Sequence, residues 1–230
     1  YLGRRAHGDY EQRVAVTLMR GTVIQREAML SFSNECRSLA RLDHPNIARM
    51  VEGSLTDDGT PYLVMEYVEG RPIDVYCVER GLGVRERVAL LRQVAAAIAA
   101  LHRHSTIHRD VKPANVVVTD DGHVKLIDFG IARVLDLADD AGDLTVAGFE
   151  RMTPTYASPE QLRGDDLTTA SDVYSLGVLA YRVLTGRLPI QGTNRRELER
   201  EMTENLATRP SVAARASETT GIAPRALEGD

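Results

Sequence analysis

Several scarcities in this 230-residue chain exclude whole classes of protein. The two cysteines, Cys36 and Cys77, cannot build a disulfide framework, and no secretory signal is present, so a reducing cytoplasm is the expected compartment. No apolar run reaches the roughly 20 residues that a membrane-spanning helix needs, although an anchor outside this segment is compatible with the sequence. The formal net charge of -5 implies no broad basic surface, which argues against a nucleic-acid partner.

Lysine is also scarce. Of the 28 basic residues, only Lys112 and Lys125 are lysines, and the others are arginine. The base composition of the genome explains such a bias more simply than selection at each site. One consequence matters for function: no lysine precedes Lys112 in the chain.

The rest of the composition is ordinary for a soluble globular protein. Hydrophobic residues make up 43% and charged residues 27%, so the chain can bury a sizeable core as one large domain or as two lobes. It begins at Tyr1 without an initiating Met, and we expect it to be an excerpt that is truncated at both ends.

Strand patterns dominate the first part of the chain. The β-branched run Val14–Met19 predicts a strand, and Ile47–Leu55 with Tyr62–Val68 predicts a hairpin across a turn-rich connection. Between them, Arg26–Leu42 predicts a helix, because apolar residues recur about every 3.6 positions. The residues that carry this spacing are Ala28, Phe32, Cys36, Leu39 and Ala40.

Helix patterns dominate the later part. We expect Glu69–Pro72 to be a linker, Val84–His104 to form a long helix and Thr169–Thr185 to form a second one. The apolar face of the first of these helices comprises Val88, Leu91, Val94, Ala95, Ile98 and Leu101.

A two-lobed α+β fold follows from this order of elements, since strands come first and helices later. Residues 1–68 would form a small, mostly β lobe with one helix. Residues 69–230 would form a larger, mainly helical lobe. The sequence pattern of its charged tail, from Thr193 onward, indicates no definite structure.

Two short motifs carry the chemistry. The segment His108–Asn115 reads HRDVKPAN, and Asp128–Gly130 follows it, each beside a short apolar strand. Asp110 can accept a proton from an attacking hydroxyl, and Asn115 and Asp128 can hold Mg²⁺ on a nucleotide. The alternative is a polar surface loop whose acidic residues cap turns.

Together the two motifs resemble the catalytic core of the protein kinase family. The resemblance is close to the bacterial serine/threonine kinases from Tyr1 to about Pro189. It implies that Lys112 projects beside Asp110 and stabilises the transferring phosphoryl group, and a lysine at this position marks serine/threonine kinases. It further implies a kinase fold, ATP and Mg²⁺ as cofactors, and protein substrates with Ser or Thr acceptors.

The same resemblance assigns roles in the activation segment and behind the catalytic loop. Thr153, at the start of Thr153–Glu160, would hydrogen-bond the catalytic residues Asp110 and Lys112. Asp172 would anchor the backbone of the catalytic loop. A hydrophobic spine linking the lobes would consist of Leu39, Met50, His108 and Phe129.

Regulation by phosphorylation is a further implication. Arg109 precedes the catalytic Asp, and kinases with that arginine are often switched by an activation-loop phosphate that pairs with arginine. Thr145 is the candidate for self-phosphorylation, with a solvated loop threonine as the alternative. Glu160 is expected to pair with an arginine that lies beyond Asp230.

The resemblance also implies where ATP binds. Met65 would gate the back pocket at the hinge between the lobes, and backbone groups of Glu66 and Val68 would bond the adenine. Ala15 and Val117 would sandwich the adenine ring.

Thr17 is the main departure from the family pattern. Glu35 matches the helix glutamate that normally pairs with a strand lysine, but Thr17 occupies the place of that lysine, and the glycine-rich loop is missing. Arg13 faces the same side of the strand but lies four residues away, roughly 13 Å. Losing one well-placed electrostatic donor costs other enzymes on the order of 10²–10³ in rate.

Two functional classes therefore remain open. The first is an ATP-dependent protein serine/threonine kinase, which the intact Asp110, Asn115 and Asp128 favour. The second is a pseudokinase, a nucleotide-binding or scaffolding module, which Thr17 favours. A small-molecule phosphotransferase of related fold is a more distant third, since the activation segment and Asp172 indicate a protein acceptor.

Overall fold

A computed structural model describes most of the chain. Thr145 and Thr153 lie outside the described residues. Among the helices that are described, none is both long enough and apolar enough to cross a bilayer. The described ranges are 1–4, 12–18, 26–129, 154–192, 194–204, 207–215 and 221–228, without the side chains of 26–29 and 31.

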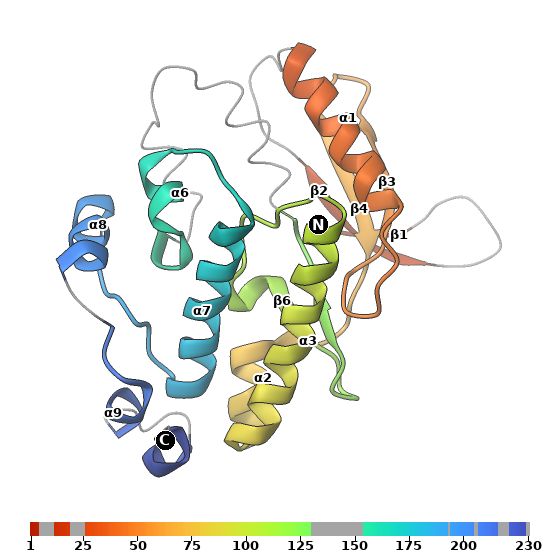
Figure 1. Cartoon of the computed structure of the whole chain (residues 1–230). Coiled ribbons are helices and arrows are strands. Elements are labelled where there is room, and N and C mark those ends of the chain that lie inside the picture. Colours follow the sequence, from red (N-terminus) through yellow and green to blue (C-terminus); the bar gives the residue numbers. More distant parts are fainter. Residues whose placement is uncertain are drawn as a thin grey trace.

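The small lobe consists of β1 (Leu2–Arg4), β2 (Arg13–Leu18), α1 (Arg26–Ala40), β3 (Met50–Leu55) and β4 (Pro61–Glu66). The strands form an antiparallel sheet in the order β1-β2-β4-β3, and α1 packs against β3 (Figure 1). Phe32, Cys36 and Leu39 are buried, as the apolar spacing of α1 predicts. A Cβ on Gly53 of β3 would lie 2.7 Å from the Sγ of Cys36, so glycine permits this close approach.

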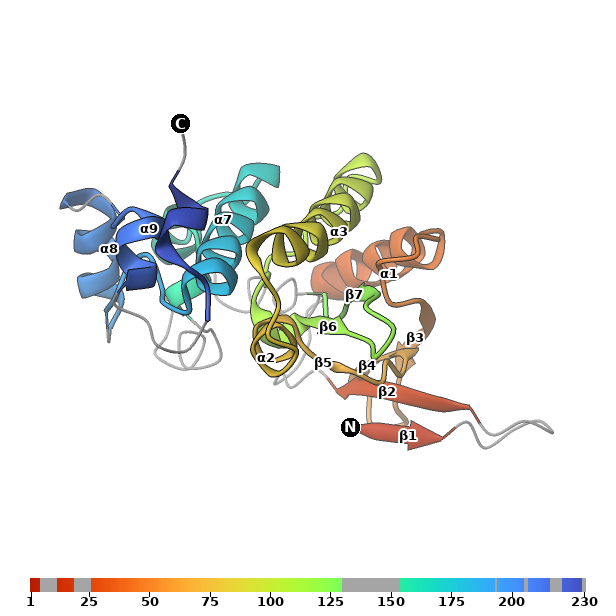
Figure 2. The same ribbon diagram turned by 90° about the horizontal axis from the view of Figure 1, so that it is seen from below.

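The larger lobe is mainly helical. Its strands pair in the order β5-β6-β7, and α3 packs against α7. Figure 2 shows the small-lobe sheet at one side of the molecule and α7, α8 and α9 at the other, with α3 between them. The elements are β5 (Arg71–Pro72), α2 (Ile73–Glu79), α3 (Val84–Arg103), β6 (Val116–Val118), β7 (Val124–Leu126), α6 (Pro159–Arg163), α7 (Thr169–Thr185), α8 (Arg195–Glu204) and α9 (Pro210–Arg215), with single 3₁₀ turns η1 (Pro113–Asn115), η2 (Pro154–Tyr156) and η3 (Pro224–Leu227).

The predicted element types are largely confirmed. The helix predicted over Thr169–Thr185 has those bounds, because the Thr168 side chain caps its start and Gly186, with φ of 72°, ends it. The strand predicted over Ile47–Leu55 is shorter in the structure, where β3 begins at Met50. The expected linker is not wholly irregular, since Arg71–Pro72 pairs with β6 as β5.

One side of α3 is not as predicted. Val88 is 40% exposed, and the neighbouring Arg87 is buried in its place. The Arg87 guanidinium donates to the carbonyl oxygens of Leu82 at 2.8 Å, Val183 at 2.7 Å and Cys77 at 3.3 Å. The buried charge thus ties α2, α3 and α7 together, and its burial lowers the pKa of Arg87.

Hydrogen bonds between the segment before β3 and strand β7 join the two lobes, close to the predicted catalytic residues. Leu126 of β7 donates its N–H to the Asn46 carbonyl and accepts from the N–H of Ala48, both at 2.9 Å. The Asn46 side chain reaches the Val124 carbonyl at 2.9 Å and the Gln93 side-chain oxygen at 3.0 Å. These bonds hold β7, the strand that precedes Asp128, against the small lobe.

Candidate active site

The first turn of α7 holds the loop that contains the HRD motif. Asp172 is 1% exposed, and its two carboxylate oxygens accept the backbone N–H groups of His108 and Arg109, each at 2.8 Å. The Nε2 of His102 lies 2.7 Å from Asp172 Oδ2. The predicted anchoring contact is therefore present, and a buried carboxylate fixes the backbone immediately before Asp110.

One cationic and one polar side chain, those of Lys112 and Asn115, hold the Asp110 carboxylate. Lys112 Nζ lies 2.8 Å from Asp110 Oδ2. The η1 turn brings Asn115 back to the same residue, where its Nδ2 donates to Asp110 Oδ2 and to the Asp110 carbonyl, both at 2.8 Å. Both side chains bind Oδ2, so Oδ1 is the atom that can receive a proton from an acceptor hydroxyl.

Asp128 follows β7 in the left-handed region, with φ of 57°. The residue is exposed, yet neighbouring groups desolvate its carboxylate and the Asp110 carboxylate repels its charge, so the pKa of Asp128 is raised. The negative charge of Asp110 beside the Asp128 carboxylate makes this a place for a cation.

The oxygen donors fit Mg²⁺. Asp128 offers a carboxylate, and Asn115 offers its side-chain oxygen because its Nδ2 is engaged by Asp110. Mg²⁺ is commonly held by one or two such side chains together with substrate phosphates. In the described part of the chain, no group of three or more His, Cys, Asp or Glu could hold a metal ion.

His108 is a core residue. Its side chain is 0% exposed, its ring lies 5.4 Å from that of Phe129, and burial lowers its pKa. Leu39 and Phe129 belong to one buried cluster, and Met50 packs against it. The predicted spine residues thus come from both lobes and pack into one core, with a neutral His108 supporting the loop.

Glu35 meets a cation other than the one that the family pattern leads one to expect. Its Oε2 lies 3.5 Å from Nη1 of Arg109, in a pair whose side chains are 13% and 20% exposed. Burial raises the pKa of Glu35, and Arg109 opposes that rise. Thr17 pairs with Leu63 across β2 and β4, while Arg13 is occupied by Glu69 at 2.6 Å. Arg13 therefore does not replace the missing lysine.

A model of the protein kinase domain matches residues 4–223 of the chain. The chain belongs to the protein kinase family. Its relatives include the serine/threonine-protein kinases pkn3 of Myxococcus xanthus, 37% identical over 77% of this chain and 34% of the relative, and PknA of Mycobacterium tuberculosis, 38% identical over 79% and 42%. The probable serine/threonine-protein kinase PknB of Bifidobacterium longum is 36% identical over 87% and 30%. The chain spans less than half the length of these relatives.

The kinase fold has a solved counterpart. The crystal structure of Rad53 1–466 in complex with AMP-PNP superposes with a TM-score of 0.69 and 27% identity, covering 100% of this chain and 57% of that one. The two-lobed α+β fold expected from the sequence is thereby confirmed.

The residues expected around adenine lie on three strands of this kinase fold. Ala15 of β2 pairs directly with Met65 of β4, which is 4% exposed. Val117 is buried on β6, and Glu66 and Val68 are half-buried at and after the end of β4. Their contact with a nucleotide remains a prediction.

Both lysines of the kinase domain are engaged in ion pairs. Lys112 holds Asp110, and Lys125 of β7 lies 2.6 Å from the carboxylate of Glu66. Sequence reasoning gave Lys125 no role, since this pair joins residues 59 positions apart. Neither lysine is left to supply the charge that Thr17 lacks.

Gln161 of α6 was also missed as a site residue. Its side chain donates to the Arg109 carbonyl at 2.8 Å, immediately before Asp110. The Ser158-x-x-Gln161 spacing, which indicates a helix cap, was the available signal. Nearby, Glu160 accepts a hydrogen bond from Ser171 Oγ at 2.5 Å.

Proposed function

We propose that this kinase domain transfers the γ-phosphoryl group of ATP to Ser or Thr hydroxyls of protein substrates. One observation carries the proposal: the Asp110 carboxylate is held by Lys112 and Asn115 on a loop whose backbone is anchored by the buried Asp172. A polar surface loop with acids capping turns does not require this convergence of side chains from separate elements.

Each side chain has a role in the proposed transfer. Asp110 accepts the proton of the attacking hydroxyl, and Lys112 places positive charge beside the transferring group. Asn115 and Asp128 would hold Mg²⁺, which neutralises phosphate charge when it is bound with ATP. Ala15, Met65 and Val117 would enclose the adenine.

The relatives support protein acceptors, since pkn3, PknA and PknB are named serine/threonine-protein kinases. The nucleotide analogue in the Rad53 structure supports ATP as the donor. Hydrogen bonding of Thr153 to Asp110 and Lys112, and self-phosphorylation at Thr145, belong to the same proposal.

The second candidate is a pseudokinase that binds a nucleotide or a partner without transfer. Thr17 favours it, because a threonine stands where the family has the strand lysine that neutralises the α- and β-phosphates. The complete set of Asp110, Asn115 and Asp128 favours the enzyme, since a scaffold has little need of both metal ligands and the base.

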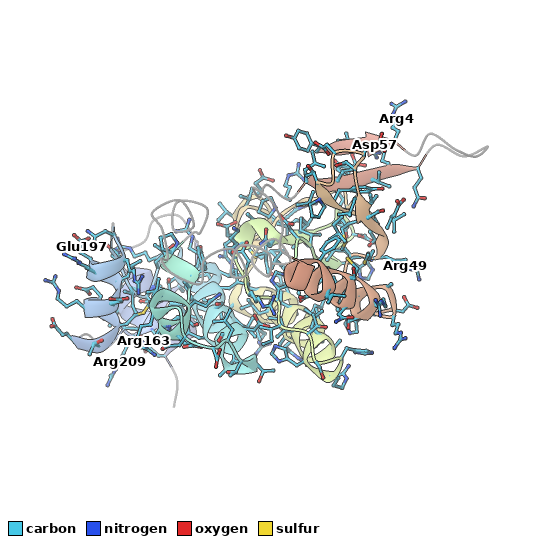
Figure 3. All side chains as sticks on the ribbon, turned by 90° about the horizontal axis from the view of Figure 1, so that it is seen from above. Arg4, Arg49, Asp57, Arg163, Glu197 and Arg209 are labelled. Atoms are coloured by element: carbon cyan, nitrogen blue, oxygen red, sulfur yellow. The ribbon has the colours of Figure 1, made fainter. Side chains whose placement is uncertain are left out.

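A phosphate-transfer assay on the full-length protein tests the proposal, with Mg-ATP as donor and dephosphorylated casein as a general acceptor. We expect phosphoserine or phosphothreonine to form, and Asp110→Asn to reduce the rate by about 10²–10⁴ through loss of the proton acceptor. Asp57→Asn, in an exposed turn of the small lobe (Figure 3), is the control and should leave the rate unchanged. A wild type as inactive as Asp110→Asn would overturn the proposal. A rise in melting temperature with Mg-ATP would then support a nucleotide-binding pseudokinase.

A further inference from the structure

The backbone just before Asp110 has an unusual conformation. Arg109 has φ of 67°, in the left-handed region that costs a long side chain free energy and persists only where neighbours over-determine it. Its N–H is held by Asp172 Oδ1 at 2.8 Å, as already described. On the other side, its carbonyl accepts from Gln161 Nε2, also at 2.8 Å.

The orientation of the Gln161 amide is fixed by its two partners. Its Oε1 accepts the Ser158 N–H at 3.0 Å, and its Nε2 donates to the Arg109 carbonyl. A backbone N–H can only donate and a carbonyl can only accept, so a flipped amide would lose both bonds. Gln161 is 7% exposed and Ser158 is 0% exposed, so both bonds lie inside the protein.

The Arg109 carbonyl belongs to the same planar peptide unit as the Asp110 N–H. That N–H donates to His108 Nδ1 at 3.3 Å. The peptide plane is therefore held at its oxygen by Gln161 and at its hydrogen by His108. Since the plane sets the direction in which the Asp110 side chain leaves the backbone, its rotation would move the carboxylate.

We propose that Gln161 is a positioning residue for Asp110: it holds the Arg109–Asp110 peptide and so couples the start of α6 to the proton acceptor. This inference rests on the proposed function. A small cavity lined in part by Asp110, Tyr156 and Gln161 lies at this junction. If the Gln161 donor is lost, the Arg109 carbonyl can turn toward water there, which changes the geometry of the site more than the stability of the fold.

Gln161→Glu tests the proposal, because it keeps an oxygen for the Ser158 N–H and replaces the donor to the Arg109 carbonyl with a carboxylate oxygen. In the full-length protein we expect kcat for transfer from Mg-ATP to casein to fall about tenfold, the effect of one hydrogen bond, with KM for ATP nearly unchanged. Amide hydrogen exchange of a peptide covering residues 107–116, measured without nucleotide, should become faster. Gln161→Met, which introduces no charge, should give the same two changes.

Ser158→Ala is the matched control. It removes the other half of the cap, where Ser158 Oγ accepts the Gln161 N–H at 3.4 Å, and leaves the Gln161 amide on Arg109. We expect wild-type kcat and wild-type exchange over 107–116. The proposal is overturned if Gln161→Glu and Gln161→Met behave like the wild type, or if Ser158→Ala matches them, which would assign Gln161 to capping alone. If the wild type transfers no phosphate, the exchange measurement still decides the positioning role, and only the proposed function fails.

Discussion

The two halves of the candidate site differ in how completely they are built. On the larger lobe, Asp110 is held by two side chains, and the loop beneath it is held by the buried Asp172. On the small lobe, Thr17 carries no charge, and Glu35 lies 3.5 Å from Arg109 in a loose pair. The half proposed to handle the acceptor hydroxyl is organised, whereas the half proposed to neutralise the α- and β-phosphates has Thr17 in place of a cation.

The small-lobe half of the site therefore differs from the family pattern in its charge, whereas its fold is that of the family. The small-lobe sheet, α1 and the spine are in place, and Glu35 is turned toward the site. What is missing is a positive side chain at position 17 of β2, where Thr17 stands. Lys112, Lys125 and Arg13 are each already paired with a carboxylate.

Removing the anchor of the organised half should have the largest effect. Asp172→Ala leaves the His108 and Arg109 N–H groups without their buried acceptor, so the loop that carries Asp110 loses its geometry. We expect transfer to fall by about 10²–10³, as for loss of one well-placed group in other active sites, with the melting temperature also lowered. Steady-state kinetics and thermal unfolding measure the two effects. Unchanged kinetics would mean that the anchor does not position Asp110.

The larger lobe should also depend on its buried arginine. Arg87→Ala removes the guanidinium that donates to the carbonyls of Leu82, Cys77 and Val183, and we expect a loss of about 3 kcal/mol in the free energy of unfolding. Val88→Ala, next in sequence but exposed, should change it by less than about 0.5 kcal/mol. Urea denaturation of the two variants measures the contrast. Equal losses would contradict the burial of Arg87.

Substitution in the small-lobe half of the site, which lacks the lysine, should have the smallest effect on activity. Glu35→Gln removes the pair with Arg109 but no phosphate-binding lysine, so we expect kcat/KM for ATP to change by less than about fivefold, the size of a weak ion pair. Because burial raises the pKa of Glu35, its ionisation reduces stability as pH rises above the ordinary glutamate value. As the pH rises from the ordinary glutamate pKa to the raised pKa of Glu35, the melting temperature of Glu35→Gln should therefore decline less than that of the wild type. A large loss of activity would mean that Glu35 already serves the phosphates.

The sequence predicted what depends on local patterns. Periodicity placed α1, α3 and α7, and the linear motifs located Asp110, Asn115 and Asp128 without knowledge of the fold. It failed where the partner is distant in sequence. The burial of Arg87 in place of Val88 depends on a carbonyl at the end of α7, 96 residues away. The pairing of Glu35 with Arg109 crosses 74 residues, and no spacing rule links them.

The most direct test of this contrast restores the missing charge. Thr17→Lys should raise kcat/KM for ATP by on the order of 10²-fold, the value of one well-placed electrostatic donor, and adding Glu35→Gln should remove part of that gain. The same Thr17→Lys change combined with Asp110→Asn should remain inactive. No gain from Thr17→Lys, in a protein that folds and binds Mg-ATP as the wild type does, would contradict the account that the missing cation at position 17 limits the small-lobe half of the site.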